Sequence, residues 1–402
     1  MIHSLFYKAS IEKIAPLNLP SYLEAQPLFP KFYHRCQDSG EERAAFGSLV
    51  SLPYIPKLSQ DIDPSLCFYG ALRFPCKKAD PLWAEFPSTL FFLPLYEIRQ
   101  NAHETTLLSR PFPSIPLPSP SIVLPSAPIL HKVLETPSRE KWSRMFHNTL
   151  EQIQSRSFDK VILSKKTTFS YEEDSPFFSF VEQLKQDNPS TSTFAWQMHP
   201  SSLFLGSSPE RLYQRKENII KTEAIAGTRK RNIQPLEDLK SSQDLQNSIK
   251  DQQEVLYVKK FLEEKLSPLC LSISHSNTPK IIPTRTLWHL RYLFEGILHS
   301  QVTDFDLLTA LHPTPAVGGS PRKEALDWIH EIESYSRGLY AGSIGWTSPL
   351  EASFTVAIRS ALAQKNKLHA FTGVGIVPGS NEELEWEELE HKLSHWNLPC
   401  LI

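Results

Sequence analysis

The chain has 402 residues, of which 40% are hydrophobic, 21% are charged and 11% are aromatic. This composition is typical of a folded globular protein and excludes an intrinsically disordered chain. Lys and Arg number 42 against 44 Asp and Glu, so the formal net charge of -2 gives no indication of a nucleic acid or an anionic membrane as partner.

The five cysteines and the apolar runs indicate where the protein works. The cysteine number is odd, the spacings are wide and no C-x-x-C occurs, which disfavours a disulfide framework and a zinc site. Reduced thiols are typical of the cytoplasm. The first residues lack the continuous apolar segment of a signal peptide. No apolar run reaches the ~18 residues that a membrane span needs. We therefore expect a cytoplasmic protein without a membrane partner.

Apolar segments that alternate with Pro-rich turns predict strands in the first 110 residues, at SLFYKA (4–9), SLCFYGALRF (65–74) and STLFFLPLYEI (88–98). Residues 110–128 then contain seven prolines, which disfavour a helix and favour extended or polyproline II backbone. This segment is either a linker between two domains or an ordered wrap along the surface of one large domain.

Beyond the Pro-rich segment, helical periodicity predicts helices over residues 138–155, 244–266 and 382–396, the last with Ser380 and Asn381 as N-cap candidates. Strands are expected at KVILS (160–164), STFAWQM (192–198), SLFLGSS (202–208), FTVAIRSAL (354–362) and KLHAFTGVGIV (367–377). Many strands without regular strand–helix alternation indicate the α+β class rather than a doubly wound parallel sheet.

Glu385 and Glu388 share one face of the last predicted helix, and Lys392 lies one turn beyond Glu388. Two neighbouring carboxylates repel each other unless the face is solvated or a cation lies between them. The pattern therefore fits a wet surface with an ion pair, and it also fits a site for a hard cation such as Mg²⁺.

Three further charged residues are candidates for chemistry. Glu254 lies beside an apolar stripe on the 244–266 helix, where it either reaches water or binds a cation. Lys160 begins a predicted strand; it is either solvated or, if enclosed, a general base. Glu210, in GSSPERL, would become a general acid in an apolar setting. Spacing alone does not bring the three together.

Most of the 14 glycines fall in four segments: AIAGTRKR (224–231), HPTPAVGG (312–319), RGLYAGSIGW (337–346) and GVGIVPGS (373–380). They are either ordinary turns or places where the backbone approaches a ligand closely. Arg359 is a charge within an otherwise apolar predicted strand. Its planar guanidinium suits a carboxylate, from a structural Glu or from a bound ligand.

Taken together, these segments resemble the chorismate-utilising enzyme family over residues 135–400. The collinear motifs are DKVILSKK, FLGSSPERL, TEAIAGTRKR, KDQQEVLYV, LWHLRYLFEGIL, LHPTPAVGGSP, RGLYAGSIGW, FTVAIRSAL and GVGIVPGSNEELEWEELEHKL. The resemblance implies one large α+β unit over residues 1–402, with two packed antiparallel sheets flanked by helices. Residues 1–130 would be a divergent amino-terminal portion of that unit, and the Pro-rich segment a wrap.

Lys160 stands where members of the isochorismate synthase type have Lys and ammonia-using relatives usually have Gln. The resemblance thus implies Mg²⁺-dependent isomerisation of chorismate to isochorismate, feeding menaquinone or siderophore synthesis, by a monomer or weak homodimer. TEAIAGT is closer to the menaquinone type. The alternatives are a salicylate synthase, an aminodeoxychorismate or anthranilate synthase component I, and a relative that only binds.

The resemblance also implies roles for individual residues. Lys160 would be the base and Glu210 the acid, and Glu254 and Glu388 would bind Mg²⁺ with Glu385 beside them. The residues expected around the substrate are Gly227, His289, Tyr340, Arg359, Gly373, Gly375 and Lys392. Two departures from the family pattern, Val255 after Glu254 and Asn381-Glu382 in place of Asp-Pro, remove none of these groups.

Overall fold

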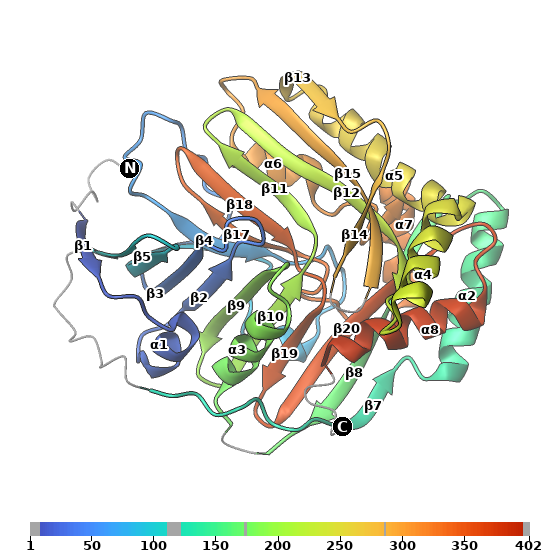
Figure 1. Cartoon of the computed structure of the whole chain (residues 1–402), viewed down its shortest axis with the longest axis horizontal. Coiled ribbons are helices and arrows are strands. Elements are labelled where there is room, and N and C mark those ends of the chain that lie inside the picture. The colour runs from blue at the N-terminus through green and yellow to red at the C-terminus, as the bar shows by residue number, and fades with distance from the viewer. Residues whose placement is uncertain (1–8, 111–121, 173–174, 285–286, 397–402) are drawn as a thin grey trace.

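The protein is described by a computed structural model that covers residues 9–110, 122–172, 175–284 and 287–396 (Figure 1). Within these ranges, twenty strands form one continuous β-sheet, called the ladder below, in which all neighbouring strands are antiparallel. Helices pack against the faces of this ladder, so the predicted α+β class is confirmed. Nearly all of the strand expected at residues 4–9, and the centre of the Pro-rich segment (111–121), lie outside the described residues.

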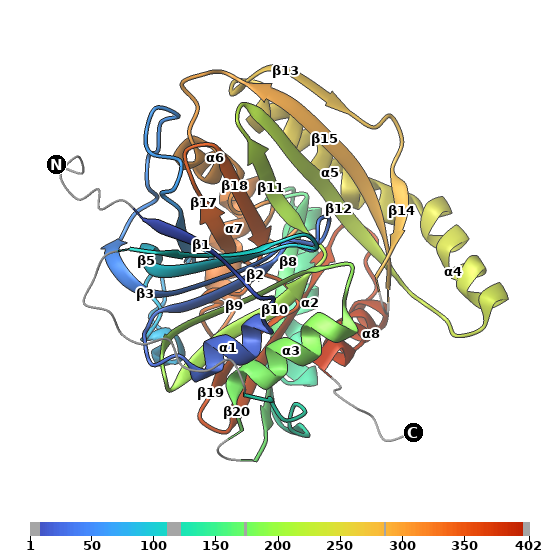
Figure 2. The ribbon, with the colours of Figure 1, turned by 60° about the vertical axis from the view of Figure 1, so that its left-hand side comes forward.

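The ladder bends over on itself, so that two halves face each other (Figures 1 and 2). In ladder order, the first half consists of β7 (His131–Thr136), β8 (Lys160–Ser170), β20 (Lys367–Ile376), β19 (Ser360–Gln364), β10 (Ser202–Ser208), β9 (Ser192–His199), β2 (Lys31–Arg35), β3 (Glu42–Leu52) and β5 (Thr89–Gln100). The short strands β16 (Gly319–Ser320), β6 (Thr105–Ser109) and β1 (Ser10–Ile14) extend its edges.

The second half continues from β5, whose first residues pair with β4. It consists of β4 (Phe68–Leu72), β17 (Ser343–Thr347), β18 (Glu351–Val356), β11 (Arg211–Lys216), β12 (Ile219–Lys230) and β15 (Leu287–Leu298), with β13 (Cys270–His275) and β14 (Lys280–Pro283) on the far edge of β15. β2 pairs with β9 and β4 pairs with β17, so strands from the first 110 residues lie inside the ladder rather than in a separate sheet.

The main apolar core fills the space between the two halves. Phe204 of the first half and Phe354 of the second both belong to it. Trp83, fully buried, lies with its ring 5.7 Å from the rings of both Phe204 and Phe371. Burial of large apolar and aromatic side chains is the dominant stabilising contribution to such a fold. This packing brings the residues on the facing strands together.

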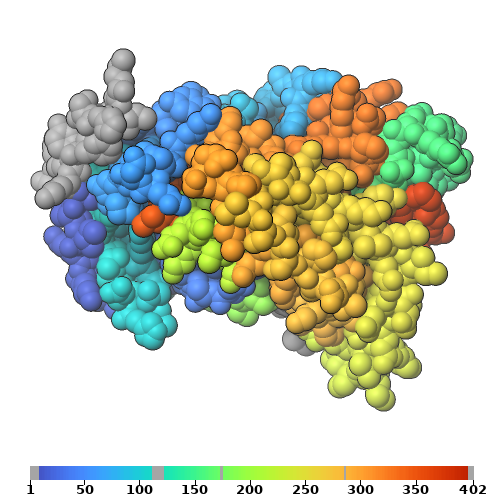
Figure 3. All heavy atoms as spheres, turned by 90° about the horizontal axis from the view of Figure 1, so that it is seen from above, coloured from blue at the N-terminus to red at the C-terminus, as the bar shows by residue number. Residues whose placement is uncertain are grey.

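Among the described residues, two helices cover the outer face of the first half, and the other six contribute buried side chains to the main core (Figures 1 and 2). The helices are α1 (Leu19–Ala25), α2 (Arg139–Gln154), α3 (Phe177–Asp187), α4 (Pro235–Asn247), α5 (Ile249–Leu266), α6 (Asp304–Leu311), α7 (Arg322–Ile332) and α8 (Glu382–Leu393), with short 3₁₀ turns at Pro81–Trp83 and Ser394–Trp396. α1 and α3 cover a second core on the outer face of the first half. α5 packs on β12 and α8 on β20. Figure 3 shows α4 projecting beyond α5.

Several expected elements are confirmed nearly residue for residue. α2 begins after Ser138, whose side chain accepts a hydrogen bond from Lys141 N at 3.4 Å. α8 begins after Asn381, whose side chain accepts from the amides of Glu383 and Leu384. Short polar side chains at these positions satisfy amides that have no partner within the helix.

Two expected elements were wrong for the same reason. In each, the apolar pattern continues along the sequence, but the backbone breaks within it. The helix expected over 244–266 is two helices, since Ser248 has extended backbone (ψ 112°) and caps α5 through Asp251 N at 3.3 Å. The strand expected over 354–362 ends at Val356 and resumes at Ser360. Arg359 lies between the two strands with φ +50°, which is left-handed backbone that a residue other than glycine does not adopt in a regular strand.

No helix of the described residues is long and apolar enough to cross a membrane. Cys36, Cys67, Cys76 and Cys270 are free thiols in the part of the chain that the structure describes.

Candidate active site

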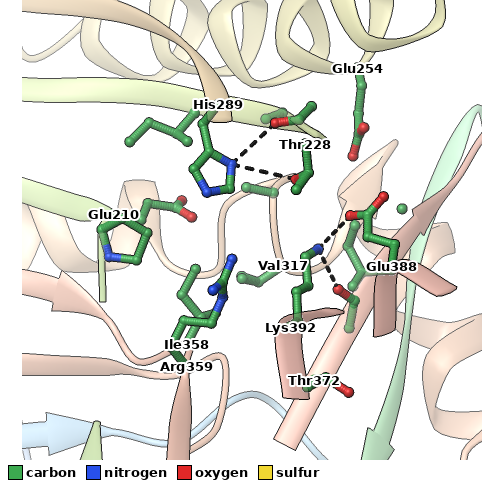
Figure 4. A pocket seen from close by; sticks show the side chains of 18 of the residues that line it. Glu210, Thr228, Glu254, His289, Val317, Ile358, Arg359, Thr372, Glu388 and Lys392 are labelled. Atoms are coloured by element: carbon green, nitrogen blue, oxygen red, sulfur yellow. Dashed lines mark hydrogen bonds and ion pairs between the residues drawn. The ribbon is translucent and has the colours of Figure 1, made fainter. Parts of the chain in front are cut away.

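A pocket opens between the two halves, where β20 and α8 meet β12, β15 and α5 (Figure 4). All of the predicted site residues line it except Lys160 and Glu385. The lining residues predicted from the sequence are Glu210, Gly227, Glu254, His289, Tyr340, Arg359, Gly373, Gly375, Glu388 and Lys392. Segments spread over about 180 positions of the chain are thus brought to one cavity by the antiparallel ladder.

Lys160 lies at the start of β8, just behind the pocket wall, with 0% of its side chain exposed. Its Nζ is 3.1 Å from Glu254 Oε1 but makes no well-directed hydrogen bond. Burying an ammonium without full hydrogen bonding is costly, so such a group is more typical of a chemical role than of a structural one.

Gly375 makes room for this pair of charges. A Cβ at Gly375 would lie 2.4 Å from Glu254 Oε1 and 3.2 Å from Lys160 Cε. At Gly373, a Cβ would lie 2.6 Å from the Tyr340 hydroxyl. The two glycines of GVGIV therefore leave space for functional side chains, in addition to any role of their backbone toward a ligand.

We predict that Gly375→Ala lowers activity by at least tenfold and displaces Glu254, because no Cβ fits 2.4 Å from a carboxylate oxygen. The matched control is Gly318→Ala, whose Cβ would meet nothing closer than 3.4 Å. Turnover and thermal melting of both variants provide the check. Equal activity in the two variants would contradict this role of Gly375.

Glu210 precedes β11 and has 3% of its surface exposed. The Thr314 hydroxyl donates to its Oε1 at 3.5 Å, and its own amide donates to Ser208 Oγ at 3.1 Å. Burial, reinforced by the charge of Glu223, raises the pKa of Glu210 to about 8. Glu210 is therefore mainly protonated at neutral pH and can donate a proton.

This raised pKa predicts a pH dependence of stability. The folded state holds the Glu210 proton more tightly than the unfolded state, whose ordinary value is 4.5, so its contribution to stability falls as pH rises from about 4.5 to 8. The Glu210→Gln variant has no ionisable group at this position, so it does not lose stability in this way as the pH rises. We expect the melting temperature of the variant relative to wild type to rise between pH 5 and pH 8 and to level off above it. A difference independent of pH in thermal melts would contradict a raised pKa.

His289 is held by a bulge in the neighbouring strand. The pairing of β12 with β15 shifts register between Ala226 and Thr228, with Gly227 at φ +73° in the bulge. His289 Nδ1 is 3.2 Å from Gly227 O, and because a carbonyl only accepts, Nδ1 carries the hydrogen. Burial and the charge of Arg359 lower the pKa of His289 to about 3. Its Nε2, without a partner, lies toward Glu210 and Arg359 in Figure 4 and can accept from a ligand.

Arg359 provides a buried positive charge on the opposite wall (Figure 4). Its left-handed backbone is held where its carbonyl accepts from Ser207 N at 3.1 Å. Backbone of this kind costs of order 1–3 kcal/mol and is found where the surroundings impose it, often at binding sites. Tyr340 stacks on Phe371 with ring centroids 5.3 Å apart, which fixes its hydroxyl beside Gly373.

The two predicted site glutamates of α8, Glu385 and Glu388, have different partners. Glu388 lines the pocket and pairs with Lys392 at 2.7 Å, so the expected ion pair at this spacing is present. Lys392 Nζ also donates to Gly373 O at 2.8 Å. Glu385 is buried outside the pocket wall and pairs with Lys250 of α5. Burial and the nearby charge of Glu388 raise the pKa of Glu385.

The carboxylates of Glu254 and Glu388 fit a hard divalent cation. Among the residues that the structure describes, no three His, Cys, Asp or Glu side chains form a closed metal cage. Mg²⁺ usually takes only one or two protein carboxylates and completes its shell with substrate oxygens and water. Two carboxylates in one pocket, one of them in the space left by Gly375, provide that donor set.

Other lining residues were not singled out from the sequence. They are Ile162, Pro209, Ile225, Ala226, Thr228, Ala316, Val317, Ile358, Phe371 and Thr372. All except Ile162 and Pro209 fall next to, or inside, the glycine segments and the Arg359 strand pattern. Those patterns therefore predict which segments reach the pocket, but they do not predict which side chains of those segments face it. Lys250 had no such pattern, because its partner Glu385 is 135 positions away.

Comparison with known proteins agrees with this arrangement. The family model described as "Chorismate binding enzyme" matches residues 121–397. Isochorismate synthase MenF of Haemophilus influenzae is 30% identical over 389 residues, which cover 94% of this chain and 88% of that protein. Isochorismate synthase EntC of Escherichia coli is 31% identical over 259 residues, 64% of this chain and 66% of that protein.

Solved structures extend the similarity to the whole fold. The structure of MenF, the menaquinone-specific isochorismate synthase from Escherichia coli, superposes with a TM-score of 0.84 at 25% identity, covering 97% of this chain and 94% of that one. Anthranilate synthase component I from Streptococcus pneumoniae has the same fold, with a TM-score of 0.70 at 19% identity. By its matched residues, its overall fold and the pocket that they build, the chain belongs to the chorismate-binding enzyme family.

Proposed function

We propose that this protein is an isochorismate synthase, which converts chorismate to isochorismate. The observation that carries the proposal is a Glu210 in the pocket that holds its proton at neutral pH, together with a buried Lys160 just behind the pocket wall. The similarity to isochorismate synthases over most of the chain supports the same reaction. We further propose the menaquinone pathway as its setting, since the two MenF proteins match nearly the whole chain.

Lys160 and Glu210 would each carry out one of the two proton transfers in this reaction. As the proposed base, Lys160 Nζ takes a proton from water while the water oxygen bonds to C2 of chorismate. The ring double bonds shift, the C4–O bond breaks, and Glu210 gives its proton to the departing hydroxyl, which leaves as water. One water enters and one leaves, so the net reaction is an isomerisation. A further proton exchange with solvent returns both residues to their starting forms.

The remaining lining groups bind and orient a substrate with two carboxylates. Arg359 and Tyr340 suit the enolpyruvyl carboxylate, because a guanidinium and a hydroxyl both donate to carboxylate oxygens. Glu254 and Glu388 would hold Mg²⁺, which when bound neutralises the ring carboxylate against these two glutamates. His289 would accept a hydrogen bond from a substrate hydroxyl through its free Nε2.

The test is a product assay. Purified protein is incubated with chorismate and Mg²⁺, with and without ammonium, and the products are separated by chromatography with mass detection. We expect isochorismate alone, lost on addition of EDTA. Salicylate with pyruvate would identify a salicylate synthase instead, and a product that contains nitrogen and forms only with ammonium would overturn the interpretation of Lys160. Absence of turnover with retained chorismate binding would indicate a non-catalytic relative.

Three further expectations from the sequence enter this proposal. We take residues 1–402 as one functional unit, as the pairing of β2 with β9 favours. We place the enzyme in the cytoplasm, because the odd number and wide spacing of its five cysteines favour reduced thiols. We expect a monomer or weak homodimer, which light scattering tests directly.

A further inference from the structure

A second buried carboxylate lies behind the proposed acid. Glu223 is on β12, with 0% of its side chain exposed, and it does not line the pocket. Its Oε1 accepts from the Arg211 amide at 3.0 Å and from Gln37 Nε2 at 3.2 Å. Its Oε2 is 3.5 Å from Arg291 Nη1, a distance too long for a strong ion pair. Glu223 is thus a buried carboxylate held mainly by two neutral donors, with one long contact to a guanidinium.

Three hydrogen bonds hold the backbone on both sides of Glu210, and Glu223 accepts one of them. The Glu210 amide donates to Ser208 Oγ, and the Glu210 carbonyl accepts from Val356 N at 3.1 Å. Glu223 takes the next amide, that of Arg211. The chain that carries the proposed acid is therefore fixed at three successive hydrogen-bonding groups, one of which depends on Glu223.

The amino-terminal portion completes this arrangement. Gln37 and Asp38 lie in the turn between β2 and β3; Gln37 bonds Glu223, and Asp38 pairs with the Arg211 guanidinium. The family match begins at residue 121, so this turn lies outside it. The turn reaches the site because β2 is paired with β9 inside the ladder.

We propose that Glu223 is a positioning residue for Glu210: it fixes the backbone next to the acid and places a second buried carboxylate beside it. Gln37 and Asp38 hold Glu223 and Arg211 in place, which gives the amino-terminal portion a role in the site. This inference rests on the proposed function, in which Glu210 donates the proton.

The charges around Glu210 act in both directions. Glu223 on β12 favours its neutral form, whereas Lys160 on β8 and Lys392 on α8 favour its charged form, as does the hydrogen bond from Thr314. Arg359 adds a positive charge from the opposite wall, and His289 stays neutral. Glu223 opposes the effect of these positive charges at Glu210.

The decisive variant is Glu223→Gln, which keeps the side-chain shape and an oxygen for the Arg211 amide but removes the charge. Infrared titration follows the protonated carboxyl band of Glu210, assigned as the band that Glu210→Gln removes, and needs no turnover. We expect the midpoint of this titration to fall by about one pH unit relative to wild type. The alkaline limb of kcat should move by the same amount, with KM little changed.

Two more variants separate charge from structure. Glu223→Asp keeps the charge but shortens the reach to the Arg211 amide, so kcat should fall while the alkaline limb stays near its wild-type pH. Glu295→Gln on the neighbouring β15, an exposed residue paired with Lys221, should change neither. An unchanged infrared midpoint in a folded Glu223→Gln protein would overturn the inference and leave the proposed function standing. If instead the midpoint moves but wild type makes no isochorismate, the inference on Glu223 holds and the proposed function fails.

Discussion

Glu210→Gln is expected to lower the turnover of chorismate by about 10²–10⁴-fold, the usual contribution of one general acid. The amide keeps the shape of the side chain but cannot give up a proton to the C4 oxygen. KM for chorismate should change by less than about threefold, because the lost interaction belongs to the transition state. Steady-state kinetics at pH 7, below the pKa of about 8 of the carboxyl, measure both quantities.

The control for this prediction is Glu331→Gln, an exposed residue at the end of α7, which should retain full turnover. Chorismate binding to Glu210→Gln, measured by calorimetry, shows whether the pocket stays intact. Turnover within tenfold of wild type would mean that another group protonates the leaving hydroxyl, and the assignment of the acid would be withdrawn.

Lys160→Met is expected to reduce turnover by a comparable factor, because the apolar side chain fills the same space but cannot accept a proton from water. The same change removes the ammonium that lies 3.1 Å from Glu254 Oε1. A cation near Glu254 then meets less repulsion, so Mg²⁺ binding measured by calorimetry should be as tight as in wild type or tighter. Loss of turnover with retained Mg²⁺ binding separates a base from a metal-site residue.

Lys165→Met is the matched control, since Lys165 is a second fully buried lysine on β8 and pairs with Glu135 at 2.9 Å. We expect this variant to melt at a lower temperature, because it leaves Glu135 without its buried partner, while turnover stays within a few-fold of wild type. If both lysine variants lost activity equally, the effect at Lys160 would be structural, and its role as base would not stand.

Features that depend only on neighbours in the chain could be predicted before the structure was known. The caps at Ser138 and Asn381 are read within a single helical turn, and α2 and α8 begin where those residues predict. The ion pair of Glu388 with Lys392 follows from helical spacing. The glycine segments and the collinear motifs marked which stretches meet at the pocket, because each motif is a local pattern.

The way in which those stretches face one another follows only from the packing of the folded chain. Apolar periodicity continues through Ser248 and Arg359, so only the folded backbone reveals the helix break and the left-handed residue that turns a guanidinium toward the pocket. The pairing of Glu385 with Lys250 likewise joins two distant helices. None of these depends on spacing within a single element.

The protonation of the site is the clearest case of this difference. Whether Glu210 is an acid or an ordinary carboxylate depends on burial and on the charge of Glu223, which reaches it from another strand. Gln37 enters the same network from the first 40 residues through the pairing of β2 with β9. Local spacing places a carboxylate on a turn or a helix, but desolvation and through-space charge set its pKa, and both arise only when the two halves of the ladder pack together.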